Sequence, residues 1–256
     1  MTIHSLLATA SRGWRFALGL PLAVAVVSAM VSTMAATPAA AQTLTSIIKP
    51  GSPEIAATLC ARLHALGVPG ARVFDLGGDR VQVEHPAEPV PGLTPAMVNA
   101  VLTRPGHVSL HAAAAAPQEG YVSRPQPGGA LGLVYIDPRP LMTTEHVERA
   151  EITDQLGPPS IHVLLTEAGG ARLAEITSAH IGEMLAIVVD GTVVSAPRVM
   201  EPILGGSAMI TGLDNTEDAM VLAALLTGGP LPEETELLGS QLGSSGPDAV
   251  PTCTSD

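Results

Sequence analysis

The stretch MLAIVVDGTVVSAPRVMEPILGGSAMITG, residues 184–212, decides the fold of the second half of this chain. Two short β-branched runs, Ala186–Val189 and Thr192–Ser195, flank the dipeptide Asp190-Gly191. That dipeptide tolerates the positive φ angles of a two-residue hairpin turn, so we predict strand, turn, strand. No residue type in the run indicates catalysis, and we expect it to shape a sheet.

A third strand is predicted after the hairpin. Pro197 cannot donate a ladder hydrogen bond, so it marks the end of the second strand or a sheet edge. Gly205-Gly206 predicts another turn, and Ser207–Thr211 a further short strand. We expect the margins of this sheet, near Val194 and Met209, to be open.

Residues 42–113 alternate between strand and helix patterns. Strands are predicted at 43–48, at 73–83 as a hairpin, and at 107–111. Helices are predicted after Ser52 and after Thr94, because each of these capping residues precedes a proline at the first helical position. The resulting βαββαβ order is the split-βαβ arrangement of ferredoxin-like folds, which predicts an α+β class.

The remaining segments complete the predicted organisation. Residues 114–130 are rich in Ala, Pro and Gly and predict a linker. Residues 131–235 predict a second α+β subdomain with antiparallel strands. Its last helix is capped by Asn215 and carries a buried stripe of Leu222, Leu225 and Leu226. Residues 236–256 predict a disordered tail.

The N-terminus has the pattern of an export signal. Arg12 and Arg15 precede a largely apolar stretch, Phe16–Met34, and Ala39-Ala40-Ala41 offers a cleavage site between Ala41 and Gln42. An uncleaved anchor in the inner membrane is the alternative, since about 20 apolar residues can span a bilayer. Either outcome places residues 42–256 in the periplasm.

The two cysteines leave their pairing open. Cys60 and Cys253 can form a disulfide in an oxidising compartment. The alternative is a small, buried Cys60 on a helix and a Cys253 in the tail.

An ordered series of motifs closely resembles the first periplasmic domain of the SecD family, accessory subunits of the Sec protein translocase. In the second subdomain it comprises Asp190-Gly191, Ser195-Ala196-Pro197, Pro202-Ile203, Gly205-Gly206, Ile210-Thr211-Gly212 and Gly229-Pro230-Leu231-Pro232. In the first subdomain it comprises Arg62-Leu63-His64-Ala65-Leu66-Gly67-Val68 and Gly78-Asp79-Arg80-Val81-Gln82-Val83. The resemblance covers most of residues 44–235 and implies a ferredoxin-like base and a head.

The resemblance also implies a function. In that family the periplasmic head is thought to hold the translocating polypeptide and to swing relative to the base, driven by proton flow through a membrane channel. The SecD transmembrane bundle has no counterpart here, so we do not expect coupling to proton flow. Asp214 replaces the family's aromatic residue before the last helix.

The sequence holds only weak signals of catalytic or metal-binding residues. His107 and His111 are four residues apart in a predicted strand, which separates them by about 13 Å. His180 lies on an apolar helix face, and a turn role accounts for Asp190. We therefore predict no catalytic, metal-binding or cofactor-binding residues, and no enzyme.

The net charge of the chain limits the classes of partner that we expect. The net charge of −12 argues against nucleic acid and against anionic lipid surfaces. Our first hypothesis is that the chain binds unfolded or translocating polypeptide, alone or beside the Sec translocase. The second is an envelope scaffold that binds one folded partner, and the third is a hydrolase or metal enzyme.

Overall fold

The computed structural model describes residues 42–87, 91–127, 131–153, 158–213, 215–243 and 251–254. These residues belong to one unit, Ala39–Asp256, which is distinct from Met1–Pro38. The predicted signal segment, including Ala41, therefore lies outside the described residues, whereas Gln42 lies inside them.

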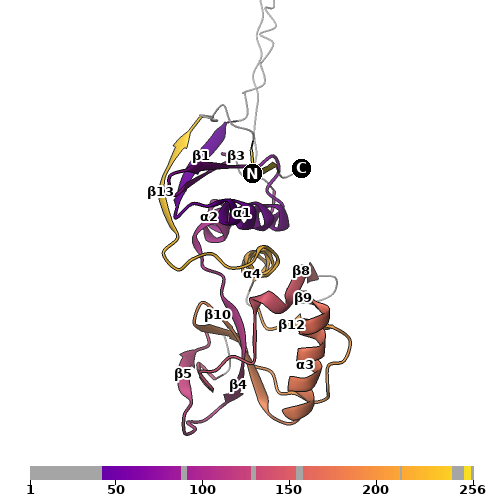
Figure 1. Cartoon of the computed structure of the whole chain (residues 1–256). Coiled ribbons are helices and arrows are strands. Elements are labelled where there is room, and N and C mark those ends of the chain that lie inside the picture. The colour runs from indigo at the N-terminus through magenta and orange to yellow at the C-terminus, as the bar shows by residue number, and fades with distance from the viewer. Residues whose placement is uncertain are drawn as a thin grey trace, which may run out of the picture. The chain divides into compact units, whose positions relative to one another are not determined.

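The first sheet is antiparallel and has the order β13-β1-β3-β2-β14 (Figure 1). Its elements are β1 (Thr43–Lys49), α1 (Pro53–Leu66), β2 (Arg72–Gly77), β3 (Arg80–Pro86), α2 (Pro95–Thr103), β13 (Glu236–Leu242) and β14 (Cys253–Thr254). Strand β3 lies between β1 and β2, as the split-βαβ prediction requires. The predicted caps are confirmed: the Ser52 hydroxyl accepts from the Ile55 N–H, and the Thr94 hydroxyl from the Met97 N–H.

The strand beside β1 differs from the expectation. The predicted closing strand at 107–111 is β4 (Val108–Ala114), which pairs with a strand of the second sheet. The place next to β1 is taken by β13, whose register runs from Leu44↔Leu242 to Lys49↔Glu236. The expected disorder of residues 236–256 is therefore wrong for β13 and β14. Most side chains of β13 are exposed, so main-chain bonding to β1 orders a segment whose composition resembles a loop.

The second sheet has the order β11-β10-β4-β6-β5, with β7 also paired to β4. Its further strands are β5 (Val122–Pro125), β6 (Leu133–Ile136), β7 (Met142–Thr143), β10 (Met184–Val189) and β11 (Thr192–Ser195). The predicted linker 114–130 thus contributes the edge strand β5, which pairs with β6 from Val122↔Ile136 to Pro125↔Leu133.

The third sheet has the order β12-β9-β8. Its strands are β8 (Val147–Thr153), β9 (Ser160–Leu165) and β12 (Ser207–Ile210), and the 3₁₀ turn η1 (Thr144–His146) leads into β8. The helices of this region are α3 (Glu167–Ala179) and α4 (Thr216–Gly228). Asn215 caps α4 as predicted, because its Oδ1 accepts from the Asp218 N–H at 2.8 Å.

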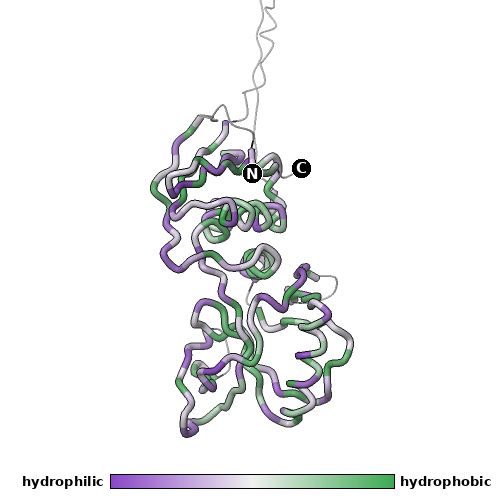
Figure 2. Tube along the Cα trace, viewed as in Figure 1, coloured by the Kyte–Doolittle hydropathy of each residue, from purple (hydrophilic) through white to green (hydrophobic). Residues whose placement is uncertain are grey.

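Helix α4 packs on two hydrophobic cores. Val221, Ala224 and Leu225 belong to the core of the first sheet, whereas Leu222 and Leu226 belong to the core between the second and third sheets. Figure 1 shows the helix between α1 and β8, and Figure 2 shows it as mostly hydrophobic. A helix apolar on all sides is typical of burial on all sides. The predicted single stripe of Leu222, Leu225 and Leu226 is therefore divided between two cores.

A disulfide joins the C-terminal strand to the first helix. Cys60 of α1 and Cys253 of β14 are bonded, and their Cα atoms are 6.3 Å apart. Of the two alternatives left open by the sequence, the structure has the paired one.

Candidate functional site

The predicted hairpin at Asp190-Gly191 is present. Asp190 has φ 48° and Gly191 φ 81°, the two positive angles of the turn type that suits a two-residue hairpin. Val189 pairs with Thr192 across the turn. Pro197 follows β11 and has no N–H to donate. Its carbonyl still accepts a hydrogen bond from the Leu185 N–H at 3.0 Å.

The Asp190 side chain does more than form a turn. Its Oδ1 accepts from the His107 N–H at 2.9 Å, and its Oδ2 accepts from Arg104 Nη2 at 3.2 Å and Nε at 3.3 Å. The Asp190 N–H also donates to the His107 carbonyl at 3.0 Å. The hairpin is thereby fastened to residues 104–107, which connect α2 to β4. No local pattern predicts the contact with Arg104, because the two residues are 86 positions apart.

Arg62 is a second link between the base and α4. Its side chain is fully buried and donates five hydrogen bonds, all to backbone carbonyls: Val101, Arg104, Pro105 and, twice, Gly229. These carbonyls follow or end α2 and α4, where a cation is favourable. Burial lowers the pKa of Arg62 to about 10, and the Asp190 carboxylate partly offsets that effect. Arg62 therefore remains charged at neutral pH.

Close packing surrounds this guanidinium. A Cβ added at Gly228 would lie 2.3 Å from Arg62 Cγ, which no side chain can tolerate without a shift. The resemblance motif included Arg62 but assigned it no role. A signal was present in the sequence, since Arg62 occupies a position on the buried stripe formed by Leu59, Leu63 and Leu66.

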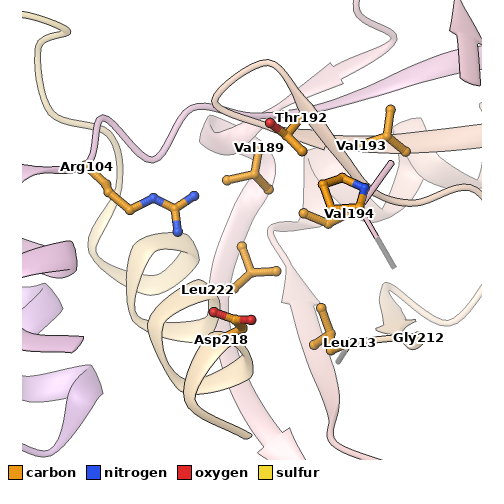
Figure 3. A pocket seen from close by; sticks show the side chains of 10 residues that line it. Arg104, Val189, Thr192, Val193, Val194, Gly212, Leu213, Asp218 and Leu222 are labelled. Atoms are coloured by element: carbon orange, nitrogen blue, oxygen red, sulfur yellow. The ribbon is translucent and has the colours of Figure 1, made fainter. Parts of the chain in front are cut away.

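A pocket of about 150 Å³ lies beside the hairpin (Figure 3). Its walls come from Arg104, Pro127, Val189, Thr192, Val193, Val194, Gly212, Leu213, Asp218 and Leu222. Figure 3 shows Leu222 and Asp218 on α4 below Val189 and Thr192 of the hairpin, with the Arg104 guanidinium pointing in from the left. The pocket is small, and Arg104 and Asp218 are its charged lining residues. Asp214, where the sequence departs from the family pattern, lies outside the described residues.

The two predicted sheet margins differ in exposure. Strand β11 pairs only with β10 within the described residues, but it also contacts β5, and Val194 is half-buried. Strand β12 pairs only with β9 within the same residues, and its Met209 side chain is 51% exposed. The β12 margin is therefore the more accessible one.

Backbone groups of β12 point away from its partner. The Leu165 N–H donates to the Gly206 carbonyl at 3.0 Å, which makes these two residues a hydrogen-bonded pair. Bonded and non-bonded pairs alternate along an antiparallel ladder, and the register from Ser207↔Leu164 to Ile210↔Ile161 has no bulge. Ser207 and Met209 consequently direct their N–H and C=O groups to the outer edge.

Exposed apolar side chains lie before β12 in the sequence. Met200 is 79% exposed and Leu204 75% exposed, and both lie in the loop that leads from β11 into β12. Ile181 is 55% exposed and lies beside that loop, because the Gly182 N–H donates to the Val199 carbonyl at 2.8 Å. This loop runs back along α3 from Gly182 to Gly170, so Ile181 and Met200 lie near the C-terminal end of α3 and away from β12.

Two of the three histidines named in the sequence analysis, His111 and His180, have side-chain contacts, and His107 is exposed. His111 is buried, with Nδ1 2.7 Å from the Asp137 carbonyl oxygen and Nε2 2.8 Å from the Ser109 hydroxyl. His180 follows α3, and its Nδ1 lies 2.8 Å from the Ile176 carbonyl oxygen. In the part of the chain that the structure describes, no three His, Cys, Asp or Glu side chains gather as metal ligands would.

Part of the chain matches the model of a known protein family. Residues 120–233 match the family model described as SecDF, P1 head subdomain. The predicted resemblance to SecD is confirmed. The SecD-like head thus includes both strand margins, the hairpin and α4.

Curated relatives match part of this chain. Protein translocase subunit SecD of Acidaminococcus fermentans is 41% identical over 101 residues, which are 38% of this chain and 24% of that protein. SecD of Rhodobacter capsulatus is 37% identical over 115 residues, 43% of this chain and 21% of that protein. Protein translocase subunit SecDF of Thermus thermophilus is 37% identical over 110 residues, 41% of this chain and 15% of that protein. The chain therefore spans about a quarter or less of these relatives.

Solved structures show the same fold. A crystal structure of SecDF in a super-membrane-facing form has a TM-score of 0.61 at 24% identity, over 78% of this chain and 30% of that one. A second SecDF structure, of a membrane component that enhances protein export, has a TM-score of 0.57 at 23% identity, over 76% of this chain and 98% of that one. The predicted α+β class is confirmed. None of the helices in the described ranges has the length and apolar character needed to cross a bilayer.

Proposed function

We propose that the SecD-like head binds extended, unfolded polypeptide in the periplasm along the outer edge of β12, as a non-enzymatic accessory to protein export. The observation that carries this proposal is the accessible edge of β12, with outward N–H and C=O groups at Ser207 and Met209. An extended peptide can add to such an edge as one more strand.

Recognition of this kind depends little on sequence. The two outward residues are separated by about 6.8 Å along the strand, which matches the repeat of an added strand. Main-chain groups provide the bonds, so any extended segment without proline at the bonding positions can fit. The flexible side chain of Met209, which is 51% exposed on β12, adds a preference for apolar side chains.

The expected affinity is low. Four outward backbone groups at about 1 kcal/mol each supply only a few kcal/mol, and ordering the peptide offsets part of it. Weak and short-lived binding suits a polypeptide that must move past the site.

The relatives support the biological setting. The matching curated proteins are named protein translocase subunits, and one solved relative is described as a component that enhances protein export. The proposal takes exported polypeptides and the Sec translocase as partners from these relatives. The predicted export signal supports a periplasmic location.

Photo-crosslinking tests the proposal. A photoreactive residue at Met209 in intact cells is expected to capture many exported polypeptides, whereas one at Asp79, on a turn of the base, is expected to capture few. A single dominant folded protein at Met209 would instead indicate an envelope scaffold.

Binding in solution gives an independent readout. A small secreted protein whose disulfides are reduced and blocked with iodoacetamide should bind the chain, and its native form should not. Equal binding of both forms, or of neither, contradicts the proposal.

A further inference from the structure

The described part of the C-terminal segment pairs with the edge of β2. Among the described residues, strand β14 pairs Cys253 with Val73 and Thr254 with Arg72. The Thr252 N–H donates to the Val73 carbonyl at 2.7 Å, and the Thr252 hydroxyl accepts from the Asp75 N–H at 3.4 Å. We call residues 251–254 the strap. A ladder this short does not hold a strand in place without other support.

The support is covalent. Cys253 is bonded to Cys60 on α1, the helix that packs against the same core as β2. Both cysteines are only half-buried and lie against the margin of that core. The disulfide therefore holds the strap between the helix and the sheet edge.

A reductant can reach this disulfide. A pocket of about 370 Å³ is lined by Cys60, Cys253, Ala57, Ala61, His64 and Thr227. The two alanines on α1 are small, and Ala57 and His64 are exposed. Both cysteines therefore line a hollow that is large enough for a small thiol to enter.

The sheet and the core of the base are complete without the strap. Strands β13, β1, β3 and β2 form a continuous sheet, and its core is filled by buried residues of α1, α2 and α4. Cys253 is only partly buried against that core. Loss of the strap would thus be a local opening and leave the remaining sheet in place.

We propose that the Cys60–Cys253 disulfide is a redox-sensitive clasp, which keeps the strap on β2 when oxidised and releases it when a dithiol reduces it. A thiolate of the dithiol bonds to one cysteine sulfur, the Sγ–Sγ bond breaks, and the leaving sulfur takes up a proton. The second thiol of the reagent then displaces the first sulfur. Two protein thiols and one oxidised, cyclic disulfide result. Release uncovers the Val73 carbonyl and the Asp75 N–H, and with them a strand edge on the base.

Hydrogen exchange of the full chain tests this proposal. In dilute dithiothreitol without denaturant, exchange in residues 251–254 should approach that of an unfolded peptide. Exchange of the Asp75 N–H should rise about tenfold or more, whereas exchange in α1 and in residues 81–84 of β3 should stay unchanged. The double variant Cys60→Ser/Cys253→Ser should show the same pattern without reductant and should not respond to it.

A matched control separates the disulfide from the surrounding contacts. Thr254→Ala changes an exposed side chain of the strap but keeps the disulfide and the Thr252 contact to Asp75, so its oxidised form should retain the protection of the wild type. Three results would overturn the proposal: unchanged protection of the Asp75 N–H after reduction, joint loss of protection in α1 and β3, or sulfurs that resist the reductant until the protein unfolds.

Discussion

Arg62→Ala should destabilise the fold more than any other single change considered in this molecule. The substitution leaves the carbonyls of Val101, Arg104 and Gly229 without their donor, whereas the Pro105 carbonyl keeps the Leu231 N–H. A buried acceptor that loses its partner costs about 1–3 kcal/mol. Because the Arg104 and Gly229 carbonyls bond in partly buried surroundings, we take the low end of that range for each. The expected loss is about 3–4 kcal/mol, a large share of the roughly 5–15 kcal/mol that stabilises a typical domain.

Urea denaturation followed by circular dichroism measures this loss. Arg62→Lys keeps the charge but not the planar fork, so it should recover only about half of the stability. Arg104→Ala is the matched control, since its ion pair with Asp190 is partly exposed and should contribute at most about 1 kcal/mol. A loss below about 1 kcal/mol for Arg62→Ala, or full recovery with lysine, would refute the reasoning.

Three further outcomes are expected. Met209→Pro removes one outward N–H without breaking a bond to β9, so it should weaken binding of unfolded polypeptide about fivefold, or about 1 kcal/mol, with little change in the urea midpoint; unchanged affinity in a peptide titration would argue against the β12 edge. Gly228→Ala should cost about 2–3 kcal/mol because its Cβ meets Arg62, whereas Gly239→Ala on β13 meets no atom within 4 Å and should be nearly neutral in the same denaturation assay. Burial lowers the pKa of His85, so its stabilising contribution is complete above about pH 6.5 and is lost as the pH falls through the folded pKa; a pH series of unfolding free energies should be flatter for His85→Gln.

Local signals in the sequence predicted local structure well. The Asp190-Gly191 turn and the caps at Ser52, Thr94 and Asn215 all depend on the conformational preference of one or two residues, and all are present. The accessible margin at Met209 followed from the same strand pattern. These features need no knowledge of distant segments.

Long-range pairing could not be predicted in the same way. The strand at 108–114 satisfies its hydrogen bonds equally well in either sheet, and its choice of β10 depends on packing across many residues. Strand β13 lacks an alternating buried face, so only its main-chain partner reveals it. The Arg104–Asp190 contact likewise arises from the meeting of two segments, each of which looks ordinary alone.

The two-sided packing of α4 has a consequence for how the chain unfolds. Removing this helix would expose the interiors of both subdomains at once, so neither is expected to melt while the other persists. The boundaries seen along the sequence therefore do not mark independent cooperative units. A single calorimetric transition should report on the base and the head together, and fragments divided near residue 113 should be expected to associate before either becomes well ordered.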